Sequence, residues 1–444
     1  MKKNSPSPSL EKRGVSKKNS LWPQRTGSKK RVLIALSGGI DSAVSAYLLI
    51  KQGFQVEGAF MKNWTSQEGL LKNECPWLED RRDALRVAGF LGIKLHTLDF
   101  EKQYQNTVMK YFFTEYKAGR TPNPDVMCNK EIKFKLLYNW ARQHKFDYLA
   151  TGHYAQVCSA PIYRQSEEPI NGHATLVRSK DEFKDQTYFI YNIKTEQLPH
   201  LLFPIGGMKK TEVRNLARKI KLPNAERKES MGLCFVGKIR LKDFLQQKIK
   251  AKTGNVVFLP PLTPPSKGGE SAVPPLLTKG GEGKVVVPPL TKGRVGGVIG
   301  HHQGLHNYTI GQRQGIQVGG QGGPYFVLGK DLKTNTLLVT NDPKDPRLLV
   351  KEVQLHSVNW LTPPNPLFRK EGGRDSSPLK IRGDKGVILI GRYRHQGELV
   401  PLTIKFIKKD LYKIIFKKPQ KAVVSGQSLV LYKGQECVGG GVIA

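Results

Sequence analysis

A turn of small and acidic residues follows the first apolar run of the chain. Residues 31–36 read RVLIAL and residues 37–42 read SGGIDS, after which apolar residues recur at helical spacing. A glycine-rich turn between a strand and a helix directs backbone N–H groups and the positive end of the helix toward phosphate. Because this turn lacks the lysine of a Walker A loop, the sequence predicts a phosphate site of another kind.

The carboxylate in this turn has two possible roles. Asp41 lies among the expected phosphate-binding donors, where it suits a Mg²⁺ ion that bridges phosphate oxygens. Alternatively, Asp41 and Ser42 only cap the helix that follows the turn. The residues themselves favour nucleotide binding and leave the metal open.

Cys128 is the next residue with evident chemistry. It stands where a proline-containing segment, NPDVMC, gives way to a helical pattern, and Lys130 and Lys133 follow it. A thiol near the positive end of a helix and near two lysines is expected to ionise more readily than a free thiol. Asp125 lies three residues earlier, where it can accept a proton or cap the turn. The alternative is a shielded, inert cysteine.

Cys234 follows a glycine between apolar neighbours in SMGLCFVG, residues 230–237. Alone, it has the surroundings of a buried structural cysteine. Taken together with Cys128, it suggests a redox pair of cysteines.

The other cysteines are Cys75, Cys158 and Cys437, and we assign them no role. The total of five is odd and includes no CxxC pair, which indicates neither a disulfide framework nor a four-cysteine zinc site. Such cysteine usage is typical of a reducing cytosol.

The elements around these residues alternate between strand and helix. Strands are expected at 32–36, 55–61, 95–100 and 147–152, and helices at 42–52, 77–91, 101–118, 128–143 and 209–222. Such alternation predicts an α/β domain with a parallel sheet covered on both faces. Ligands bind at the carboxyl ends of such strands, where the SGGIDS turn, Met61, Gly152 and His153 are expected to lie.

Beyond about residue 250 the composition of the sequence changes. Residues 254–300 repeat a phrase of PPL, Thr and Lys-Gly-Gly, and residues 363–386 are similarly rich in Pro and Gly. We interpret both as low-complexity insertions, because segments of this composition have too few large apolar residues to form a packed core. The alternating apolar runs around them predict one or two small β-barrel-like modules. A shorter insertion, residues 159–172, lies between the strand at ATGHYA and the strand before KDQTYF.

The chain is strongly basic. It has 72 Lys and Arg against 36 Asp and Glu, a net charge of +36. Residues 1–30, which we expect to be a disordered tail, and the two long insertions carry about +8, +3 and +3, so about +22 remains. A protein of this charge usually meets a polyanion, most often nucleic acid. Since no apolar run reaches membrane-spanning length, a membrane is not the expected partner.

Several segments resemble, in order, those of bacterial tRNA-specific 2-thiouridylases, members of the PP-loop ATP pyrophosphatase superfamily. The segments are SGGIDS (37–42), FMKNW (60–64), AGRTPNPDVMCNKEIKF (118–134), ATGHYA (150–155), KDQTYF (184–189), SMGLCFVG (230–237), HQGLHNYTIGQRQG (302–315), RYRH (392–395) and GQSLVLY (426–432). The resemblance implies a PP-loop catalytic domain at 31–235, a central β-rich domain at 236–346 and a C-terminal β-barrel-like domain at 347–444.

The resemblance also implies roles for individual residues. ATP would be held by Ala35, Leu36, Ser37, Gly38, Gly39, Ile40, Asp41, Ser42, Met61 and Gly152. The target base would face Asn123, Pro124 and Asp125. The expected tRNA contacts are Lys184, Asp185, Gln186, His153, Arg392, Tyr393 and Gln427.

The implied reaction is the ATP-dependent 2-thiolation of the wobble uridine of tRNAs for Lys, Glu and Gln. ATP, with Mg²⁺ at Asp41, would convert the C2 oxygen into an adenylate. Cys234 would carry the sulfur as a persulfide, Cys128 would be the nucleophile and Asp125 the acid or base. The resemblance further implies a persulfide donor, either a cysteine desulfurase or a relay protein, and a cytoplasmic location.

Aromatic and basic residues of the second half could serve the same RNA. Tyr308 and Tyr393 stand beside Arg313, Arg392 and Arg394, a combination that suits base stacking and phosphate contact. The alternative is a solvated, basic face of a barrel.

Three other functions stay open on the residues alone. Another PP-loop ATP-dependent amidating ligase would use SGGIDS and leave both cysteine segments idle. A non-catalytic RNA-binding protein would account for the charge alone. A third possibility keeps the thiolation but makes Asp125, Cys128 and Cys234 ligands of an iron–sulfur cluster.

Overall fold

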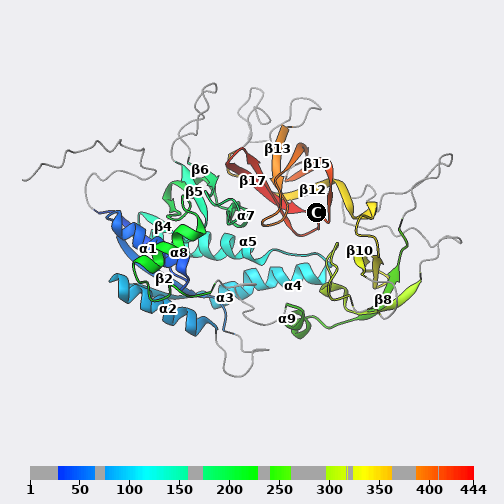
Figure 1. The fold of residues 1–444 in the computed structure, drawn as a ribbon, viewed down its shortest axis with the longest axis horizontal. Helices are drawn as coiled ribbons and strands as arrows, with labels where there is room; N and C mark the ends of the chain where they lie inside the picture. The colour runs from blue at the N-terminus through cyan, green and yellow to red at the C-terminus, as the bar shows by residue number, and fades with distance from the viewer. Residues whose placement is uncertain are drawn as a thin grey trace, which may run out of the picture.

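The computed structural model describes nine parts of the chain (Figure 1). They are residues 29–65, 76–158, 174–228, 241–261, 297–316, 318, 324–362, 387–408 and 410–444. Cys75 and Cys234, the insertions at 159–172 and 363–386, and most of the tail at 1–30 lie outside the described residues.

The catalytic domain is built on a parallel sheet, as the sequence predicts. Its strand order is β3-β2-β1-β4-β7, and every neighbouring pair is parallel. The strands are β1 (Arg31–Ala35), β2 (Gln55–Lys62), β3 (Leu95–Asp99), β4 (Tyr148–Ala150) and β7 (Leu201–Leu202). The two-residue β7 extends the sheet beyond β4 and was not expected from the sequence.

Alternating residues of β1 face opposite layers of helices. Leu33 packs in a core with Phe134 and Leu137, whereas Val32 and Ile34 pack with residues of the first helix. All three β1 residues are fully buried, which explains why the strand is a continuous apolar run rather than an alternating one. The sheet is therefore covered on both faces.

The helices of the two layers agree closely with the predicted ranges. One layer contains α1 (Ile40–Lys51), α2 (Pro76–Leu91) and α8 (Lys210–Lys219), whose apolar residues share one cluster. The other contains two long helices that each include a wide π-helical stretch. They consist of α3 (Glu101–Tyr104), η1 (Gln105–Met109) and α4 (Lys110–Lys117), and of α5 (Pro124–Cys128), η2 (Asn129–Leu137) and α6 (Tyr138–Gln143).

The C-terminal module is a closed antiparallel barrel. Its strands follow the order β12-β15-β14-β13-β16-β17, and β17 pairs back to β12. They are β12 (Leu349–Trp360), β13 (Val387–Arg392), β14 (Val400–Lys408), β15 (Leu411–Lys421), β16 (Ser428–Lys433) and β17 (Glu436–Ile443). This confirms the barrel-like module predicted for the end of the chain.

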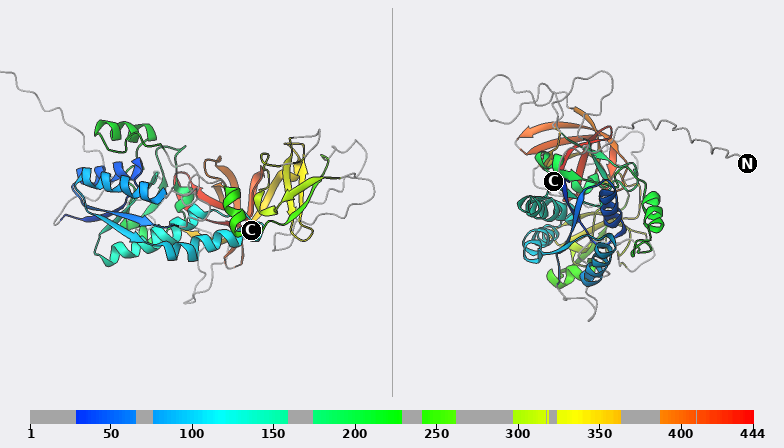
Figure 2. Two further views of the ribbon diagram at one scale, coloured as in Figure 1. Left: turned by 90° about the horizontal axis from the view of Figure 1, so that it is seen from below. Right: turned by 90° about the vertical axis from the view of Figure 1, so that its left-hand side faces the viewer.

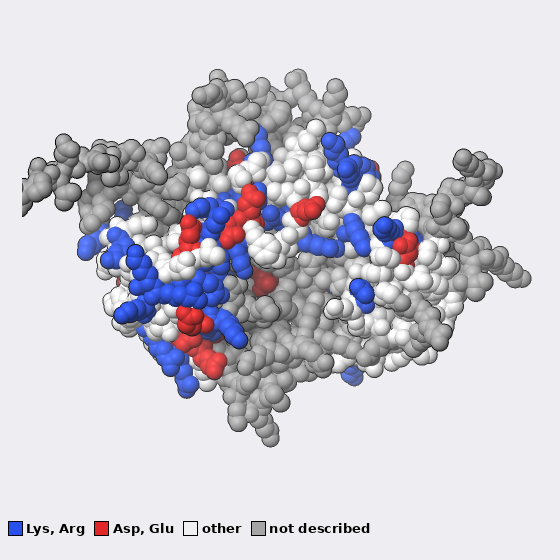
Figure 3. Space-filling model, in the orientation of Figure 1, with Lys and Arg blue, Asp and Glu red and all other residues white. Residues whose placement is uncertain are grey.

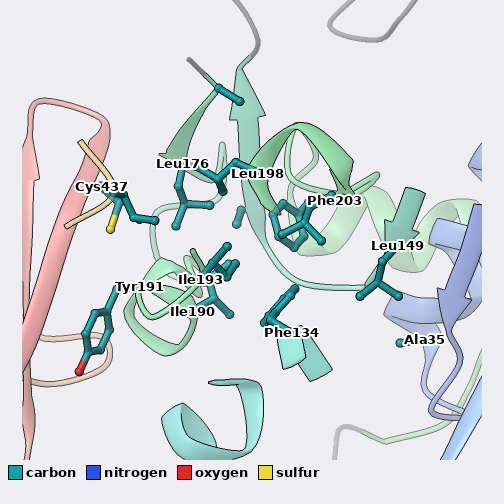
Figure 4. Packing of buried hydrophobic residues seen from close by; sticks show 14 of the residues in the cluster. Ala35, Phe134, Leu149, Leu176, Ile190, Tyr191, Ile193, Leu198, Phe203 and Cys437 are labelled. Carbon is teal, nitrogen blue, oxygen red and sulfur yellow. The ribbon is translucent and has the colours of Figure 1, made fainter. Parts of the chain in front are cut away.

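The barrel continues into the catalytic domain. β5 (Ala155–Cys158) and β6 (Thr175–Arg178) flank the 159–172 insertion, and β6 pairs with β17 through the register Glu436–Val177. A single apolar cluster accordingly runs from the parallel sheet to the barrel: Figure 4 shows Ala35 and Leu149 on the sheet side and Tyr191 and Cys437 on the barrel side. The two modules share one core.

The central module is a four-stranded sheet of order β10-β11-β8-β9. Its strands are β8 (Thr253–Phe258), β9 (Val298–Gln303), β10 (Phe326–Asp331) and β11 (Thr336–Thr340). The proposed insertion at 254–300 is too wide at both ends, because its first and last residues belong to β8 and β9. Val256, for example, is buried in the core of this module.

The modules follow one another along the longest axis of the molecule, with the barrel between the catalytic domain and the central sheet (Figures 1 and 2). In its described parts the chain also forms five short helices, of which α9 and η5 lie between modules and the others within them. These are α7 (Thr187–Ile190), η3 (Thr195–His200), α9 (Leu241–Lys248), η4 (Leu305–Asn307) and η5 (Pro346–Leu348). Among the described helices, none combines the length and the apolar character needed to cross a bilayer.

Candidate active site

The SGGIDS turn lies at the carboxyl end of β1, where a parallel sheet presents its ligand site. Ala35 ends the strand, and Leu36 continues the pairing by donating its N–H to the carbonyl of Ala59 at 2.8 Å. Gly38 has φ +79°, and a Cβ atom there would lie 2.4 Å from the carbonyl oxygen of Asp80. Glycine is thus required here both for the backbone conformation and for the close approach of α2.

Hydroxyl groups organise the inside of this turn. The Ser42 hydroxyl donates to the Gly39 carbonyl at 3.0 Å and accepts from the Ser37 N–H at 3.3 Å. The N-cap of α1 is Gly39, which has no side-chain cap. The alternative in which Asp41 and Ser42 only cap the helix is therefore wrong, because Ser42 donates to the carbonyl of Gly39 and Asp41 bonds Lys210.

Gly152 lies against the first turn of α1. A Cβ atom on Gly152 would be 2.7 Å from the Ser42 backbone nitrogen and 2.9 Å from the Asp41 carbonyl carbon. Any side chain would displace the start of the helix. The structure thus brings Gly152 to the SGGIDS turn although 110 residues separate them in the chain. Met61, near the end of β2, is partly buried against the apolar cluster that contains Leu33 and Phe134.

Asp41 is paired with a lysine that the sequence analysis missed. Lys210, the first residue of α8, donates from Nζ to Oδ1 and Oδ2 of Asp41 at 2.8 and 2.9 Å. The buried Tyr154 donates its hydroxyl to Asp41 Oδ1 at 3.1 Å. The sequence contained one indirect indication of Lys210. Because the turn itself contains no lysine, a positive charge near it has to come from elsewhere in the chain.

Two side chains from the segment after α8 donate hydrogen bonds to the carbonyl of Gly38. Asn224 donates from Nδ2 at 2.7 Å and Arg227 from a guanidinium nitrogen at 3.2 Å. The same guanidinium pairs with Asp80 and Asp83 of α2. Asn224 and Arg227 lie in the segment that leads to Cys234, and neither was predicted to support the turn.

A Mg²⁺ ion fits this site only in part. Magnesium commonly takes one or two protein carboxylates together with phosphate oxygens and water. Asp41 is 32% exposed and can supply one carboxylate, but both its oxygens accept hydrogen bonds from Lys210. Within the described ranges, no group of three or more His, Cys, Asp and Glu side chains gathers to hold a metal.

Cys128 lies at the end of α5, 7% exposed, in a cluster with Phe112, Tyr116 and Ile132. Burial raises the pKa of its thiol to about 11, and the positive charge of Lys133 offsets only part of this effect. The expectation of a readily ionised thiol is therefore wrong for the protein alone. Desolvation of the thiolate outweighs the nearby positive charge because the sulfur lies in an apolar cluster.

The helix that carries Cys128 begins with the residues expected at the target base. Asn123 is the N-cap, and its Oδ1 accepts the N–H of Val126 at 3.2 Å. Pro124 occupies the first turn, where its missing N–H costs nothing. Because the Asn123 side chain makes this hydrogen bond, Asn123 is the cap, and the alternative that assigned the cap to Asp125 is wrong. Asp125 is partly exposed in the same turn.

His153 is buried beneath the Cys128 helix rather than presented on a surface. It is 8% exposed, and its Nδ1 lies 2.7 Å from the Thr151 hydroxyl. Its Nε2 lies 3.5 Å from Lys133 Nζ, and burial together with that lysine holds the pKa of His153 well below its usual value. His153 is thus a neutral imidazole that accepts a hydrogen bond from the lysine.

The residues expected at the tRNA divide into two groups. Asp185 and Arg392 form an ion pair at 3.0 Å in which both side chains are almost completely buried. The Gln427 amide donates to the Thr121 carbonyl at 2.8 Å, just before Asn123. These three residues attach the barrel to the catalytic domain. Lys184, Gln186 and Tyr393 are partly exposed.

Tyr308 does not belong to an RNA-stacking surface. It is 5% exposed and packs with Val256 and Leu305 in the core of the central module. The expectation for Tyr308 is wrong because β9 and η4 turn its ring inward. Arg313 and Arg394 are exposed.

Basic side chains gather on one face of the catalytic domain. In Figure 3, blue side chains cover the area over α1, α2 and α8, with fewer acidic ones among them. An anionic ligand approaching the SGGIDS turn from this side meets a positive field.

A parallel sheet with a glycine–serine turn after its first strand, joined to two β-modules, defines an α/β enzyme of the PP-loop class. Three family models match in order: the tRNA methyl transferase HUP domain at 30–238, the tRNA methyl transferase PRC-barrel domain at 283–341 and the aminomethyltransferase beta-barrel domain at 350–443. These matches cover the three modules of the fold.

Two relatives illustrate the similarity over the whole chain. The tRNA-specific 2-thiouridylase MnmA of Flavobacterium johnsoniae is 40% identical over 420 residues, 94% of this chain and 100% of the relative. That of Shewanella sp. strain MR-4 is 38% identical over 96% of this chain and 98% of the relative. The chain therefore belongs to the tRNA-specific 2-thiouridylase family.

Solved structures are similar only at a distance. A 4-thiouridine synthetase–RNA complex with bound ATP is 18% identical, with a TM-score of 0.32 over 49% of this chain and 50% of that one. The NMN synthetase of Francisella tularensis is 19% identical, with a TM-score of 0.27 over 44% of this chain and 64% of that one.

Proposed function

We propose that this protein, a tRNA-uridine 2-sulfurtransferase, replaces the C2 oxygen of the wobble uridine of tRNAs for Lys, Glu and Gln with sulfur. The family membership carries this proposal. The basic face around the SGGIDS turn suits a polyanionic substrate, and a cytoplasmic location follows from the need to meet tRNA.

The nucleotide would bind at the SGGIDS turn. Ser37 and Gly39 are on its accessible side, and the first turn of α1 adds backbone N–H groups toward phosphate. Gly152 packs against the first turn of α1 and thereby keeps the start of this helix in place for the nucleotide. Mg²⁺, when bound, would neutralise phosphate charge, with Asp41 as its protein ligand.

Activation is needed because uridine C2 is a poor electrophile and its oxygen a poor leaving group. Attack of that oxygen on the α-phosphate of ATP forms a C2–O–AMP linkage and releases pyrophosphate. This is consistent with a turn that lacks the Walker lysine, since the bond broken is the α–β bond and not the β–γ bond. The positive field at the turn stabilises the charge that develops on the leaving pyrophosphate.

Sulfur would then move from Cys234 to the base. The terminal sulfur of a Cys234 persulfide forms the new bond to C2 and AMP leaves with the original oxygen. The thiolate of Cys128 takes the inner sulfur of the persulfide as the S–S bond breaks, which leaves a Cys128–Cys234 disulfide. A thiol reductant of two electrons then restores both cysteines. Cys128 either frees hydrosulfide before the transfer or attacks as sulfur passes to the base, and both routes end in the same disulfide.

The target base would reach this chemistry by leaving its stack in the anticodon loop. Asn123 and Pro124 form the rigid start of the Cys128 helix, and Asp125 is partly exposed beside them, where it can hold or accept a proton. Lys184, Gln186 and Tyr393 are accessible for contacts with the RNA.

The test is reconstitution with the full chain, unmodified tRNA, ATP and a persulfide donor, followed by mass spectrometry of the nucleosides. We expect 2-thiouridine only when ATP is present, and none with Cys234→Ser. An amidating ligase or an RNA-binding protein would give no 2-thiouridine with the unaltered chain. Spectra of protein purified without oxygen distinguish the iron–sulfur variant, which requires iron and labile sulfide in proportion to activity.

A further inference from the structure

Residues 119–122 form a loop that connects α4 to the residues expected at the target base. Gly119 ends α4 with φ +74°, and its N–H donates to the Tyr116 carbonyl at 3.0 Å. A glycine in this left-handed conformation is a common end of a helix. The loop leads directly to Asn123, the N-cap of the helix that carries Cys128. The position of the loop therefore determines where that helix starts.

The barrel holds the loop through Thr121. The N–H of Thr121 donates to the Ser425 carbonyl at 3.0 Å, and the Gln427 amide donates to the Thr121 carbonyl at 2.8 Å. Gly426 lies between these two partners, and a Cβ atom on it would lie 3.0 Å from the same Thr121 carbonyl oxygen. The barrel is thus in close contact with the middle of the loop.

The central module holds the start of the loop through a lysine. Lys330, near the end of β10, donates from Nζ to the Gly119 carbonyl at 2.9 Å. A Cβ atom on Gly119 would lie 3.0 Å from the side chain of Leu332, which follows β10. Farther along the loop, the Thr309 hydroxyl lies 3.4 Å from that of Thr121. In Figure 1 the end of α4 accordingly lies near the central module.

The ammonium of Lys330 is held by this carbonyl and by the end of a helix. Within the part of the chain that the structure describes, the ammonium bonds the Gly119 carbonyl and forms no ion pair with a carboxylate. Loss of water around it lowers the pKa of Lys330 to about 8. The carboxyl-terminal end of α4 carries a partial negative charge, which attracts a cation next to Gly119. Lys330 therefore makes a charge-assisted hydrogen bond, which is stronger than one between neutral groups.

We propose that Lys330 is a positioning residue for the sulfur-transfer step, because it fixes the loop at 119–122 and thereby the helix that presents Asp125 and Cys128. The inference rests on the proposed function, since it concerns the placing of the proposed nucleophile. Lys330 bonds a backbone carbonyl nine positions before Cys128 and acts through the loop. It is not a catalytic residue.

The contacts also predict which steps are independent of Lys330. The SGGIDS turn is supported by Asn224 and Arg227, which bond the Gly38 carbonyl, so ATP binding should not need the lysine. A displaced Cys128 helix should instead slow sulfur transfer. Reacting groups must be held closely, and a misplacement of about 1 Å costs on the order of a hundredfold in rate.

The test is single-turnover thiolation of tRNA by the full chain and by Lys330→Met, with ATP and a persulfide donor. We expect the rate constant at saturating tRNA and ATP to fall about ten- to hundredfold. The affinities for ATP and tRNA should change by less than about twofold. Lys330→Arg, which keeps a charged donor for the Gly119 carbonyl, should recover most of the rate. Calorimetric titration with ATP counts the folded sites, so that a smaller folded fraction is not mistaken for a slower step.

Hydrogen exchange follows the loop without the reaction. Peptides that cover residues 119–125 should exchange about tenfold faster in Lys330→Met than in the unaltered chain, the effect of one lost charged hydrogen bond. Lys333→Met, at an exposed lysine just after β10, is the matched control and should change neither the rate nor the exchange.

An unchanged rate per folded site, or unchanged exchange in the loop, would overturn the inference. A loss of ATP affinity as large as the loss of rate would show a merely structural lysine and would overturn it as well. If Lys330→Met does not fold, Lys330→Gln replaces it under the same criteria. If the unaltered chain forms no 2-thiouridine, the proposed function fails, and the exchange measurement still decides whether Lys330 holds the loop.

Discussion

The two functional regions of the catalytic domain differ in polarity and in exposure to water. The nucleotide end, residues 37–42 with Lys210, is polar and partly exposed, and its charges are already paired. The sulfur end, residues 123–128, ends in a thiol that burial keeps protonated. The proposed nucleotide site therefore has paired charges in the free protein, whereas the proposed nucleophile is shielded from water. For the role proposed above, Cys128 needs a base, a partner or exposure when the substrates bind.

Cys128→Ser should separate the two ends most clearly. We expect 2-thiouridine formation to fall by about a thousandfold or more, because a hydroxyl cannot take sulfur from a persulfide. ATP binding should persist, since Cys128 packs in its own apolar cluster away from the turn residues. Nucleoside mass spectrometry and calorimetry measure the two effects. Cys158→Ser, on a partly exposed strand residue, is the control and should keep full activity.

The buried pair of Asp185 and Arg392 joins the barrel to the catalytic domain, and Arg392→Met tests how strongly it does so. The substitution leaves Asp185 buried without its closest cation, so we expect the free energy of unfolding to drop by about 3–5 kcal/mol. Denaturant titration of the full chain measures this. Arg218→Met removes an exposed pair with Glu226 and should leave the free energy of unfolding almost unchanged, because water screens the two charges. Equal losses in the two variants would mean that the buried pair does not secure the junction.

The protonated state of Cys128 predicts a steep pH dependence of alkylation. With a pKa of about 11, the thiolate is a small minority at pH 8 and grows as the pH rises, because burial disfavours the charged form. Iodoacetamide should therefore modify Cys128 about a hundredfold more slowly in the native chain at pH 8 than in urea. Peptide mass spectrometry between pH 7 and 10 follows this. A native rate that levels off below pH 8 would contradict a buried, protonated thiol.

The smallest predicted effect concerns the support of the nucleotide end. Asn224→Ala removes the shorter of the two hydrogen bonds to the Gly38 carbonyl and leaves Arg227 in place. We expect ATP affinity to fall by about tenfold, the size of one lost buried hydrogen bond. Asn139→Ala, at an exposed position of α6, is the control and should bind ATP normally. Unchanged affinity for Asn224→Ala would mean that the loop keeps its shape without this bond.

Much of this organisation was readable in the sequence because it is local. The apolar run of β1, the glycine turn and the helical spacing after it depend on neighbours a few residues apart, and the parallel sheet follows from their alternation. Those signals also located Ser37, Asp41 and Cys128, because short motifs carry their own chemistry.

Other features depend on residues that only folding brings together. The partnership of Asp41 with Lys210 spans 169 positions, and that of Asp185 with Arg392 spans 207. Neither leaves a periodic trace in the sequence. Likewise, β6 pairs with β17 across the expected domain boundary. Long-range pairing is decided by packing and electrostatics across the whole chain, which a local pattern cannot report.

The thiol of Cys128 shows the contrast between local sequence signals and tertiary contacts in a single residue. Its sequence neighbours, two lysines and a helix start, predicted a lowered pKa, and that local argument is physically sound. The tertiary structure adds Phe112 and Tyr116 from another helix, and the loss of water around the sulfur reverses the direction of the shift. The sequence by itself determined which groups are present, and the fold decided how much water each one keeps.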